Sequence, residues 1–175
     1  KTFCCVENFM KEPKRQNTYY FVDEAGDPTF YNRFGKFIVG QEGCSKILML
    51  GFIETENPKS IRQALQRLNN EIRQDPYLQD IPSLKKSLQY FHATDDCPEV
   101  REKVYKCINA LDFKSQFVMA RKIEGVFKKY SCNETRFYDA LIGHLFKNIL
   151  HRAENNFIYF AKRGSKNRQE PLEKA

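Results

Sequence analysis

The sequence places three acidic residues at the end of an aromatic segment. Residues 18–24 read TYYFVDE and are followed by AGDP, the composition of a strand that stops at a turn. Successive side chains of a strand point to opposite faces, so Asp23 shares a face with Tyr19 and Phe21, whereas Glu24 lies on the other face. A carboxylate at the tip of a buried strand is costly unless it is paired, hydrogen-bonded or bound to a metal ion. Asp23 is therefore the leading candidate for a metal ligand, and Glu24 is a candidate catalytic group.

A structural role for the same residues remains open. Asp23, Glu24 and Asp27 could cap a turn in which Gly26 adopts backbone angles that other residues avoid. The sequence of this segment alone is compatible with either interpretation.

A second candidate segment reads FHATDD at residues 91–96. His92 could bind a metal ion, act as a general acid or base, or contact a phosphate. Asp95 could bind a metal ion, whereas Asp96, with Glu99 three residues later, has the spacing of a capping box. We therefore expect Asp96 to cap the helix that follows, and we retain His92 as a catalytic and Asp95 as a metal-binding candidate.

Cleavage of a phosphodiester by two metal ions needs carboxylates from distant points of the chain, because both ions must be held and partly neutralised. Glu124, after the segment 114–122, and Glu71, on an expected helix, could join Asp23, although a solvated surface position is the simpler interpretation of each. The expected ion is Mg²⁺ or Mn²⁺. Signatures confined to one segment, such as a P-loop, HExxH or GxSxG, are absent.

The charge of the chain suits a partner rich in phosphates. Lys and Arg number 29 against 22 Asp and Glu, which gives a net charge of +7. Each basic side chain placed against a phosphate releases a condensed counterion, although solubility alone favours a net charge of similar size. The candidate nucleic-acid contacts fall after the last expected strand, at Lys162, Arg163, Lys166 and Arg168.

Composition excludes several other classes of protein. The longest apolar run, residues 47–53, is far shorter than the roughly 20 residues of a membrane-spanning helix, and no secretory signal is visible. The six cysteines form no CxxC pair and no regular framework, which disfavours zinc and predicts mostly reduced thiols. We expect a cytoplasmic protein that does not enter a membrane, and the sequence does not define its oligomeric state.

The order of the expected elements predicts an α/β fold. We expect residues 1–17 to form a tail or an appended helix, and residues 18–24, 37–40 and 47–54 to form an antiparallel meander of three strands. Helices and strands then alternate, and their expected ranges are a helix from Asn57 to residue 74, a helix from 96 to 112, a strand over 114–122, a helix over 134–152, a strand over 157–162 and the start of a helix at 171. Such an order is typical of a mixed sheet with helices packed on it.

Several of these segments together resemble the bacterial "domain of unknown function 3800" family. The resemblance rests on DEAGD at 23–27, FIVG at 37–40, FHA at 91–93, YDAL at 138–141 and IYF at 158–160, in the same order along residues 18–175. It implies a ribonuclease-H-like fold of order βββ-α-β-α-β-α, which agrees with the elements expected above. The domain would then end inside its last helix, where Glu170 and Glu173 lie.

The resemblance also implies a metal-dependent nuclease core. Asp23 would be the central metal ligand, and Glu124 corresponds best to the acid that the family's fold places after its fourth strand. The expected function is hydrolysis of a phosphodiester by a divalent-metal-dependent nuclease. The alternatives are a nucleic-acid-binding or protein-interaction module without catalysis on the same scaffold, and a hydrolase of a small nucleotide.

Overall fold

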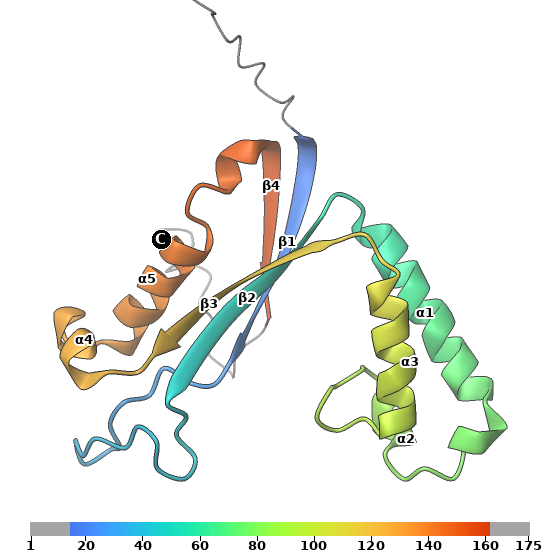
Figure 1. Ribbon diagram of the computed structural model, residues 1–175, viewed down its shortest axis with the longest axis horizontal. Helices are drawn as coiled ribbons and strands as arrows, with labels where there is room; N and C mark the ends of the chain where they lie inside the picture. The colour runs from blue at the N-terminus through green and yellow to red at the C-terminus, as the bar shows by residue number, and fades with distance from the viewer. Residues whose placement is uncertain (1–14, 162–175) are drawn as a thin grey trace, which may run out of the picture. The chain divides into compact units, whose positions relative to one another are not determined.

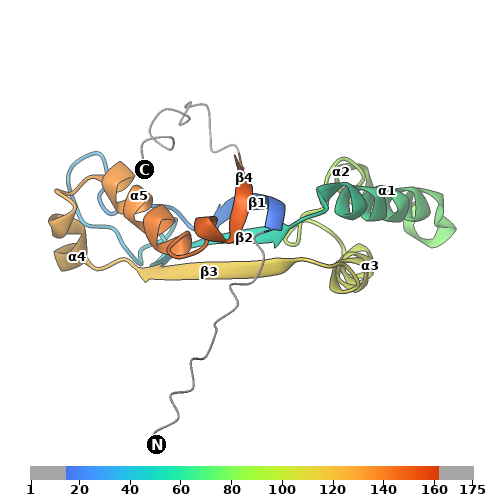
Figure 2. The same cartoon turned by 90° about the horizontal axis from the view of Figure 1, so that it is seen from above.

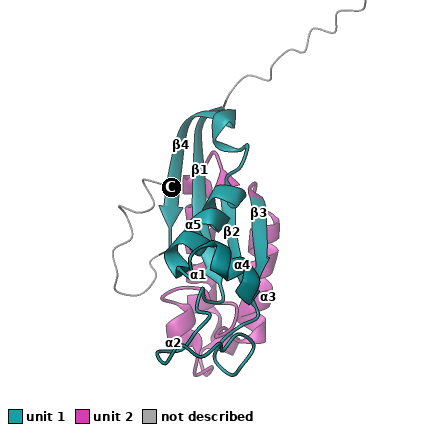
Figure 3. Cartoon of the chain, turned by 90° about the vertical axis from the view of Figure 1, so that its left-hand side faces the viewer, with its two compact units in different colours: residues 1–53, 115–175 teal, residues 54–114 magenta. Residues whose placement is uncertain are grey.

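The computed structural model describes residues 15–161, which form four strands and several helices (Figure 1). They divide into two compact units: unit 1 comprises residues up to 53 and from 115 onward, and unit 2 comprises residues 54–114 (Figure 3). Each unit has a hydrophobic core of its own. No helix in the described part of the chain is long and apolar enough to cross a bilayer.

The strands span 8 to 11 residues and the helices vary in length. In chain order the elements are β1 (Arg15–Ala25), β2 (Ile47–Thr55), α1 (Pro58–Gln74), η1 (Pro76–Leu78), α2 (Leu84–Ser87), α3 (Pro98–Asn109), β3 (Lys114–Arg121), α4 (Glu124–Lys129), α5 (Glu134–Leu145), η2 (Leu150–Arg152) and β4 (Ala153–Phe160).

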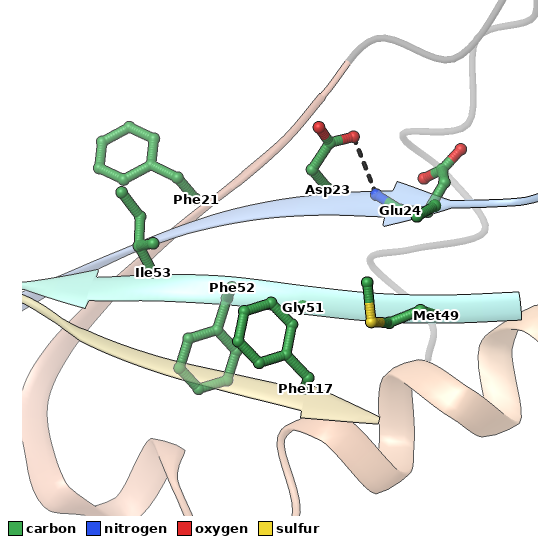
Figure 4. A pocket seen from close by; sticks show the side chains of 9 residues that line it. Phe21, Asp23, Glu24, Met49, Gly51, Phe52, Ile53 and Phe117 are labelled. Atoms are coloured by element: carbon green, nitrogen blue, oxygen red, sulfur yellow. Dashed lines mark hydrogen bonds between the residues drawn. The ribbon is translucent and has the colours of Figure 1, made fainter. Parts of the chain in front are cut away.

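The four strands form one mixed sheet in the order β3-β2-β1-β4. β4 pairs in parallel with β1, from Arg15 opposite Ala153 to Val22 opposite Phe160. β2 runs opposite to both β1 and β3 (Figure 4). The expected α/β class, with a mixed sheet and helices packed on it, is therefore confirmed.

Helix α5 covers one face of this sheet, and α4 lies beside the end of β3 and adds Phe127 to the same core (Figure 1, Figure 2). Tyr20 and Val22 of β1 point into that covered face, where the ring of Tyr20 meets the rings of Phe52 and Phe146 edge-on at centroid distances of 5.1 and 5.5 Å. The other face, which we call the open face, carries Tyr19, Phe21, Asp23, Phe117, Phe157 and Tyr159. The expected division of β1 into two faces is confirmed by this burial.

Unit 2 is helical, and its first helix begins as the sequence predicts. The side chain of Asn57 caps α1 by accepting a hydrogen bond from the amide of Ser60, and Pro58 occupies the first turn. Leu68 and Ile72 of α1 pack with Val100 and Val104 of α3 in the core of this unit.

Two expected elements are wrong. Residues 37–40 form no strand but part of a loop, where Phe37 makes a single bridge with Tyr31 and Gly40 has a φ of +82°. The third strand of the sheet is instead β3, which follows unit 2 in the chain. The helix expected over 134–152 ends at Leu145, because the chain then turns through Asn148 at a φ of +59°, a left-handed conformation that a helix cannot contain.

Candidate functional site

The leading candidate, Asp23, lies at the exposed end of β1 on the open face. Its Oδ1 accepts a hydrogen bond of 2.8 Å from the amide of Glu24, and no side chain in the described part of the chain pairs with its carboxylate. The carboxylate stands at a hollow of about 230 Å³ whose walls are almost entirely apolar, among them Phe21, Ile53 and Phe117 (Figure 4). An accessible carboxylate beside an apolar hollow is suited to bind a cation together with a ligand that fills the hollow.

Glu24 is held from the covered side of the sheet. Its Oε2 accepts a hydrogen bond of 3.0 Å from the hydroxyl of Tyr138, a buried residue of α5. Asp139 follows Tyr138 on the same helix. The two carboxylates at the end of β1 therefore differ in their surroundings: Asp23 is exposed, whereas Glu24 is oriented by a core side chain.

The second half of the DEAGD motif has a structural role. Gly26 adopts a φ of +92°, and Asp27 lies beside Lys122, whose side chain is fully buried. The Lys122 ammonium donates to the carbonyl oxygens of Thr29 (2.9 Å) and Asp27 (3.1 Å), to Asp27 Oδ1 (3.3 Å) and to Cys44 Sγ (3.3 Å). The structural interpretation of the motif thus holds for Gly26 and Asp27.

The same contacts change the acidity of Asp27. Burial alone would raise the pKa of this carboxyl, but the hydrogen bond from the Thr29 amide and the charge of Lys122 outweigh it and lower the pKa below its ordinary value. A lowered pKa in the folded state means that the ionised form stabilises the fold.

We therefore expect the ionised Asp27 carboxylate to stabilise the fold at neutral pH and this stabilisation to disappear in acid. The contribution is fully present above the ordinary aspartate pKa of about 4 and is lost as the pH falls toward the lowered value. Urea unfolding of the wild type and of Asp27→Asn at pH 7, 5, 4 and 3 measures it. The difference in unfolding free energy should be largest at neutral pH and shrink below about pH 4. A difference that stays constant with pH would show that the carboxylate charge contributes nothing.

Glu124 begins α4 rather than ending a fourth strand. Its Oε1 accepts a hydrogen bond of 2.9 Å from the Tyr31 hydroxyl and lies 3.2 Å from the Lys128 ammonium. The Tyr31 hydrogen bond, followed by that of Lys128, lowers the pKa of Glu124, and burial and the same Glu124 contact raise the pKa of Tyr31. Oε1 of Glu124 is thus already engaged by two donors.

His92 and Asp95 lie together in unit 2. His92 Nδ1 is 3.7 Å from Asp95 Oδ2, which is also paired with Lys86. The hydrogen bond from Lys86 holds the pKa of Asp95 below its usual range. Through Lys86 these contacts hold the segment against α2. The catalytic role of His92 and the metal-binding role of Asp95 stay predictions.

The expected capping role of Asp96 is wrong. Cys97 is the N-cap residue of α3, and it caps without a side-chain hydrogen bond. Asp96 is buried instead, and its two oxygens accept hydrogen bonds from the Ser87 hydroxyl (2.6 Å) and the His92 amide (2.7 Å). A buried carboxylate needs such donors more than an exposed helix terminus needs a cap.

The remaining candidates belong to other parts of the chain. Glu71 is exposed on α1 in unit 2, and Lys162, Arg163, Lys166 and Arg168 lie outside the described residues. Over residues 15–161 no three His, Cys, Asp or Glu side chains are grouped so that they could hold a metal ion.

Sequence reasoning missed Lys122 and Tyr138. Lys122 is in phase with Val118 and Ala120, which pack against the core, so the strand period already places it on the covered face. No sequence pattern links the hydroxyl of Tyr138 to a residue 114 positions away.

Comparison of the chain with family models, curated proteins and solved structures finds no match. The accessible Asp23 carboxylate, its neighbour Glu24 and the apolar hollow beside them form the candidate site.

Proposed function

We infer that this protein acts on nucleic acid as a divalent-metal-dependent nuclease whose first metal ligand is Asp23. The observation that carries the proposal is the Asp23 carboxylate, which is exposed at the end of a central strand and has no side-chain partner in residues 15–161. Every other acid of the segment 23–27 is engaged by a side chain: Glu24 by Tyr138 and Asp27 by Lys122.

The order of elements in unit 1 supports a ribonuclease-H-like scaffold. With unit 2 regarded as an insertion between β2 and β3, unit 1 reads β-β-β-α-α-β. This order matches the βββ-α-β start of the order that the resemblance implies, except that two helices, α4 and α5, precede the fourth strand. Asp23 then occupies the end of the first strand, the position that the resemblance gives to the central metal ligand.

The oxygen ligands at this position fit Mg²⁺ or Mn²⁺. Mg²⁺ usually keeps several waters and is bound through one or two carboxylates and the phosphates of a substrate, rather than by a cage of protein ligands. Asp23 would supply one such carboxylate, while Glu24 stays hydrogen-bonded to the Tyr138 hydroxyl. A bound ion would neutralise charge on the phosphodiester and lower the pKa of an attacking water.

The chain's own residues would position these groups. The Tyr138 hydroxyl restrains the Glu24 carboxylate from the covered face. Apolar side chains such as Phe21 and Ile53 line the hollow beside Asp23 and would contact the apolar parts of a bound substrate.

The test compares the wild type with Asp23→Asn, which keeps the shape of the side chain and removes its charge. Cleavage of labelled DNA and RNA is measured with Mg²⁺ or Mn²⁺ and with EDTA, and Mn²⁺ binding is measured by electron paramagnetic resonance. We expect Asp23→Asn to weaken Mn²⁺ binding and to reduce cleavage by at least about a hundredfold, equivalent to roughly 2.7 kcal/mol of transition-state stabilisation.

The matched control is Glu154→Gln, an exposed acid at the opposite end of the sheet, beside the start of β1. It should cleave as the wild type does. Undiminished divalent-dependent cleavage by Asp23→Asn would refute the proposal.

The second candidate is a nucleic-acid-binding or protein-interaction module without catalysis. The observation that favours it is the open face, which exposes aromatic rings as a binding surface does. It predicts salt-sensitive binding that needs no metal ion, and no cleavage under any of these conditions.

A further inference from the structure

The open face of the sheet exposes large apolar side chains from two strands that are not neighbours. In β3, Phe117 is 58% and Met119 is 72% exposed; in β4, Phe157 is 40% and Tyr159 is 50% exposed. Four such residues on one sheet face exceed the single exposed apolar residues that are ordinary on a protein surface. A surface of this kind marks a binding site for a ligand.

The ring of Phe117 lies directly on Gly51 of β2 (Figure 4). A Cβ atom at position 51 would come within 2.3 and 2.6 Å of two atoms of that ring, so only glycine leaves room for it. One side of the ring is therefore covered by the backbone of β2, while more than half of the side chain remains exposed.

The β4 rings are held in place from the side. Phe157 stacks on Tyr19 at a centroid distance of 4.9 Å, and Tyr159 stacks on Phe21 at 5.2 Å, with interplanar angles of 15° and 13°. Each of these β4 rings thus has one face against a β1 ring and is ordered before any ligand arrives. Preordered aromatic rings bind with little loss of conformational entropy.

Polar groups lie among the rings. Asn155 donates a hydrogen bond of 3.0 Å to Asn17 at one end of the face, and Arg121 is exposed in phase with Phe117 and Met119. Asp23 lies on the same face as Tyr19 and Phe21. A polymer that reaches the proposed metal site along this sheet face would therefore pass over the rings.

The distribution of charge agrees with a polyanion as the ligand. Residues 54–114 contain ten acidic and ten basic residues, so unit 2 contributes nothing to the net charge of +7. In unit 1, residues 15–53 are neutral and residues 115–161 carry +3, and the remaining +4 belongs to residues 1–14 and 162–175. Beyond Ala161, whose amide donates to the Val22 carbonyl next to Asp23, the sequence continues with the basic run that starts at Lys162.

We propose that the open face binds single-stranded nucleic acid by stacking bases on Phe117, Phe157 and Tyr159. This inference rests on the proposed action on nucleic acid and names its substrate as a single strand. Bases stack on exposed aromatic side chains of a sheet in several unrelated single-strand binders, because every base has a π-face and needs no particular sequence. The bases of a duplex are stacked on each other and cannot use such a surface.

The test measures binding by the full chain in EDTA, so that cleavage plays no part. The probes are fluorescein-labelled dT12, U12 and a 12-base-pair DNA duplex, followed by fluorescence anisotropy over a range of salt concentrations. We expect the single strands to bind more tightly than the duplex, and Phe117→Ala to weaken single-strand binding by about five- to a hundredfold. Tyr159→Ala should also weaken single-strand binding.

Two variants separate stacking from other uses of this face. Phe117→Leu keeps an apolar side chain but removes the ring, so it should lose nearly as much single-strand affinity as Phe117→Ala. Tyr77→Ala removes an aromatic residue that is 92% exposed in unit 2 and should bind as the wild type does.

Three outcomes would overturn the inference. They are equal binding by Phe117→Leu and the wild type, a preference for the duplex, and a wild-type dimer in light scattering that Phe117→Ala dissociates. Cleavage without aromatic dependence of binding would leave the nuclease proposal standing and refute this one. Aromatic-dependent binding without any metal-dependent cleavage would support this inference and refute the nuclease proposal.

Discussion

Replacing Lys122 with methionine is expected to lower the free energy of unfolding by about 3 kcal/mol, the low end of the range for removing one member of a buried ion pair. The Lys122 side chain is fully buried, and its ammonium holds Asp27, the Thr29 carbonyl and Cys44. Methionine fills a similar volume, so the loss comes from polar groups left without a donor rather than from a cavity. Asp27 is only partly buried and can regain water, which is why we expect the low end of the range.

Urea unfolding and thermal melting measure this effect. A loss of 3 kcal/mol corresponds to a decrease in Tm of roughly 6–12 °C for a chain of this size. Hydrogen exchange should become faster over residues 27–46, because Lys122 ties this loop to the end of β3 through both its ammonium and its amide, which donates to the Lys46 carbonyl.

The control is Lys129→Met, an exposed lysine in the last turn of α4, which should change stability by less than about 1 kcal/mol. The double variant Lys122→Met with Asp27→Asn should be less destabilised than the sum of the single variants, because the two residues share one interaction. If Lys122→Met unfolds at the same urea concentration as the wild type, the buried ammonium does not anchor the loop.

Local signals in the sequence predicted local structure well. Asn57 and Pro58 mark the start of α1, because a capping side chain and a preset φ act within a few residues of each other. The alternation of Tyr19, Tyr20, Phe21 and Val22 predicted which side chains share a face, because the period of a strand is a property of its own backbone. Which of the two faces enters the core is decided by the tertiary packing against it.

Pairing across the sheet could not be predicted in the same way. Residues 37–40 are as apolar as a short strand, yet Phe37 and Val39 pack from a loop against the core of unit 1. The third strand comes after the 61 residues of unit 2, and no local pattern in a strand identifies a partner at such a distance.

At the candidate site, too, local features could be predicted from the sequence and long-range contacts could not. The sequence singles out Asp23 as an acid at the tip of a strand expected to be buried, whereas the structure exposes this carboxylate on the open face. The partners of Glu24 and Asp27, Tyr138 and Lys122, lie 114 and 95 positions away along the chain. Whether each acid of the motif is accessible or engaged is therefore decided by tertiary packing.

The second large effect is expected at Gly26, where alanine should lower the free energy of unfolding by about 3 kcal/mol. Gly26 has a φ of +92°, and a residue with a side chain adopts this conformation at a cost of about 1–2 kcal/mol of folding free energy. A Cβ there would also approach the Ile47 carbonyl oxygen to 2.6 Å and Ser45 Oγ to 2.9 Å. The carbonyl belongs to β2 and cannot retreat without disturbing the sheet, so overpacking adds a further cost of about 1–3 kcal/mol.

Gly35→Ala separates these two costs. Gly35 has a φ of +73°, but no atom lies within 4 Å of the position of its Cβ, so alanine there should lose only the conformational part. Urea unfolding of both variants should therefore show Gly26→Ala to be less stable than Gly35→Ala by about 2 kcal/mol. Equal losses would mean that the contact with β2 relaxes freely.

The outcome bears on how the DEAGD motif is interpreted. Gly26 lets the chain turn directly against the first residue of β2, three residues after Asp23. If Gly26→Ala is as costly as expected, the glycine is required for the fold whether or not the protein cleaves nucleic acid. The chemical content of the motif would then rest on Asp23 and Glu24, and a related chain that keeps Gly26 and Asp27 but lacks Asp23 would be expected to fold like this one without binding the metal ion.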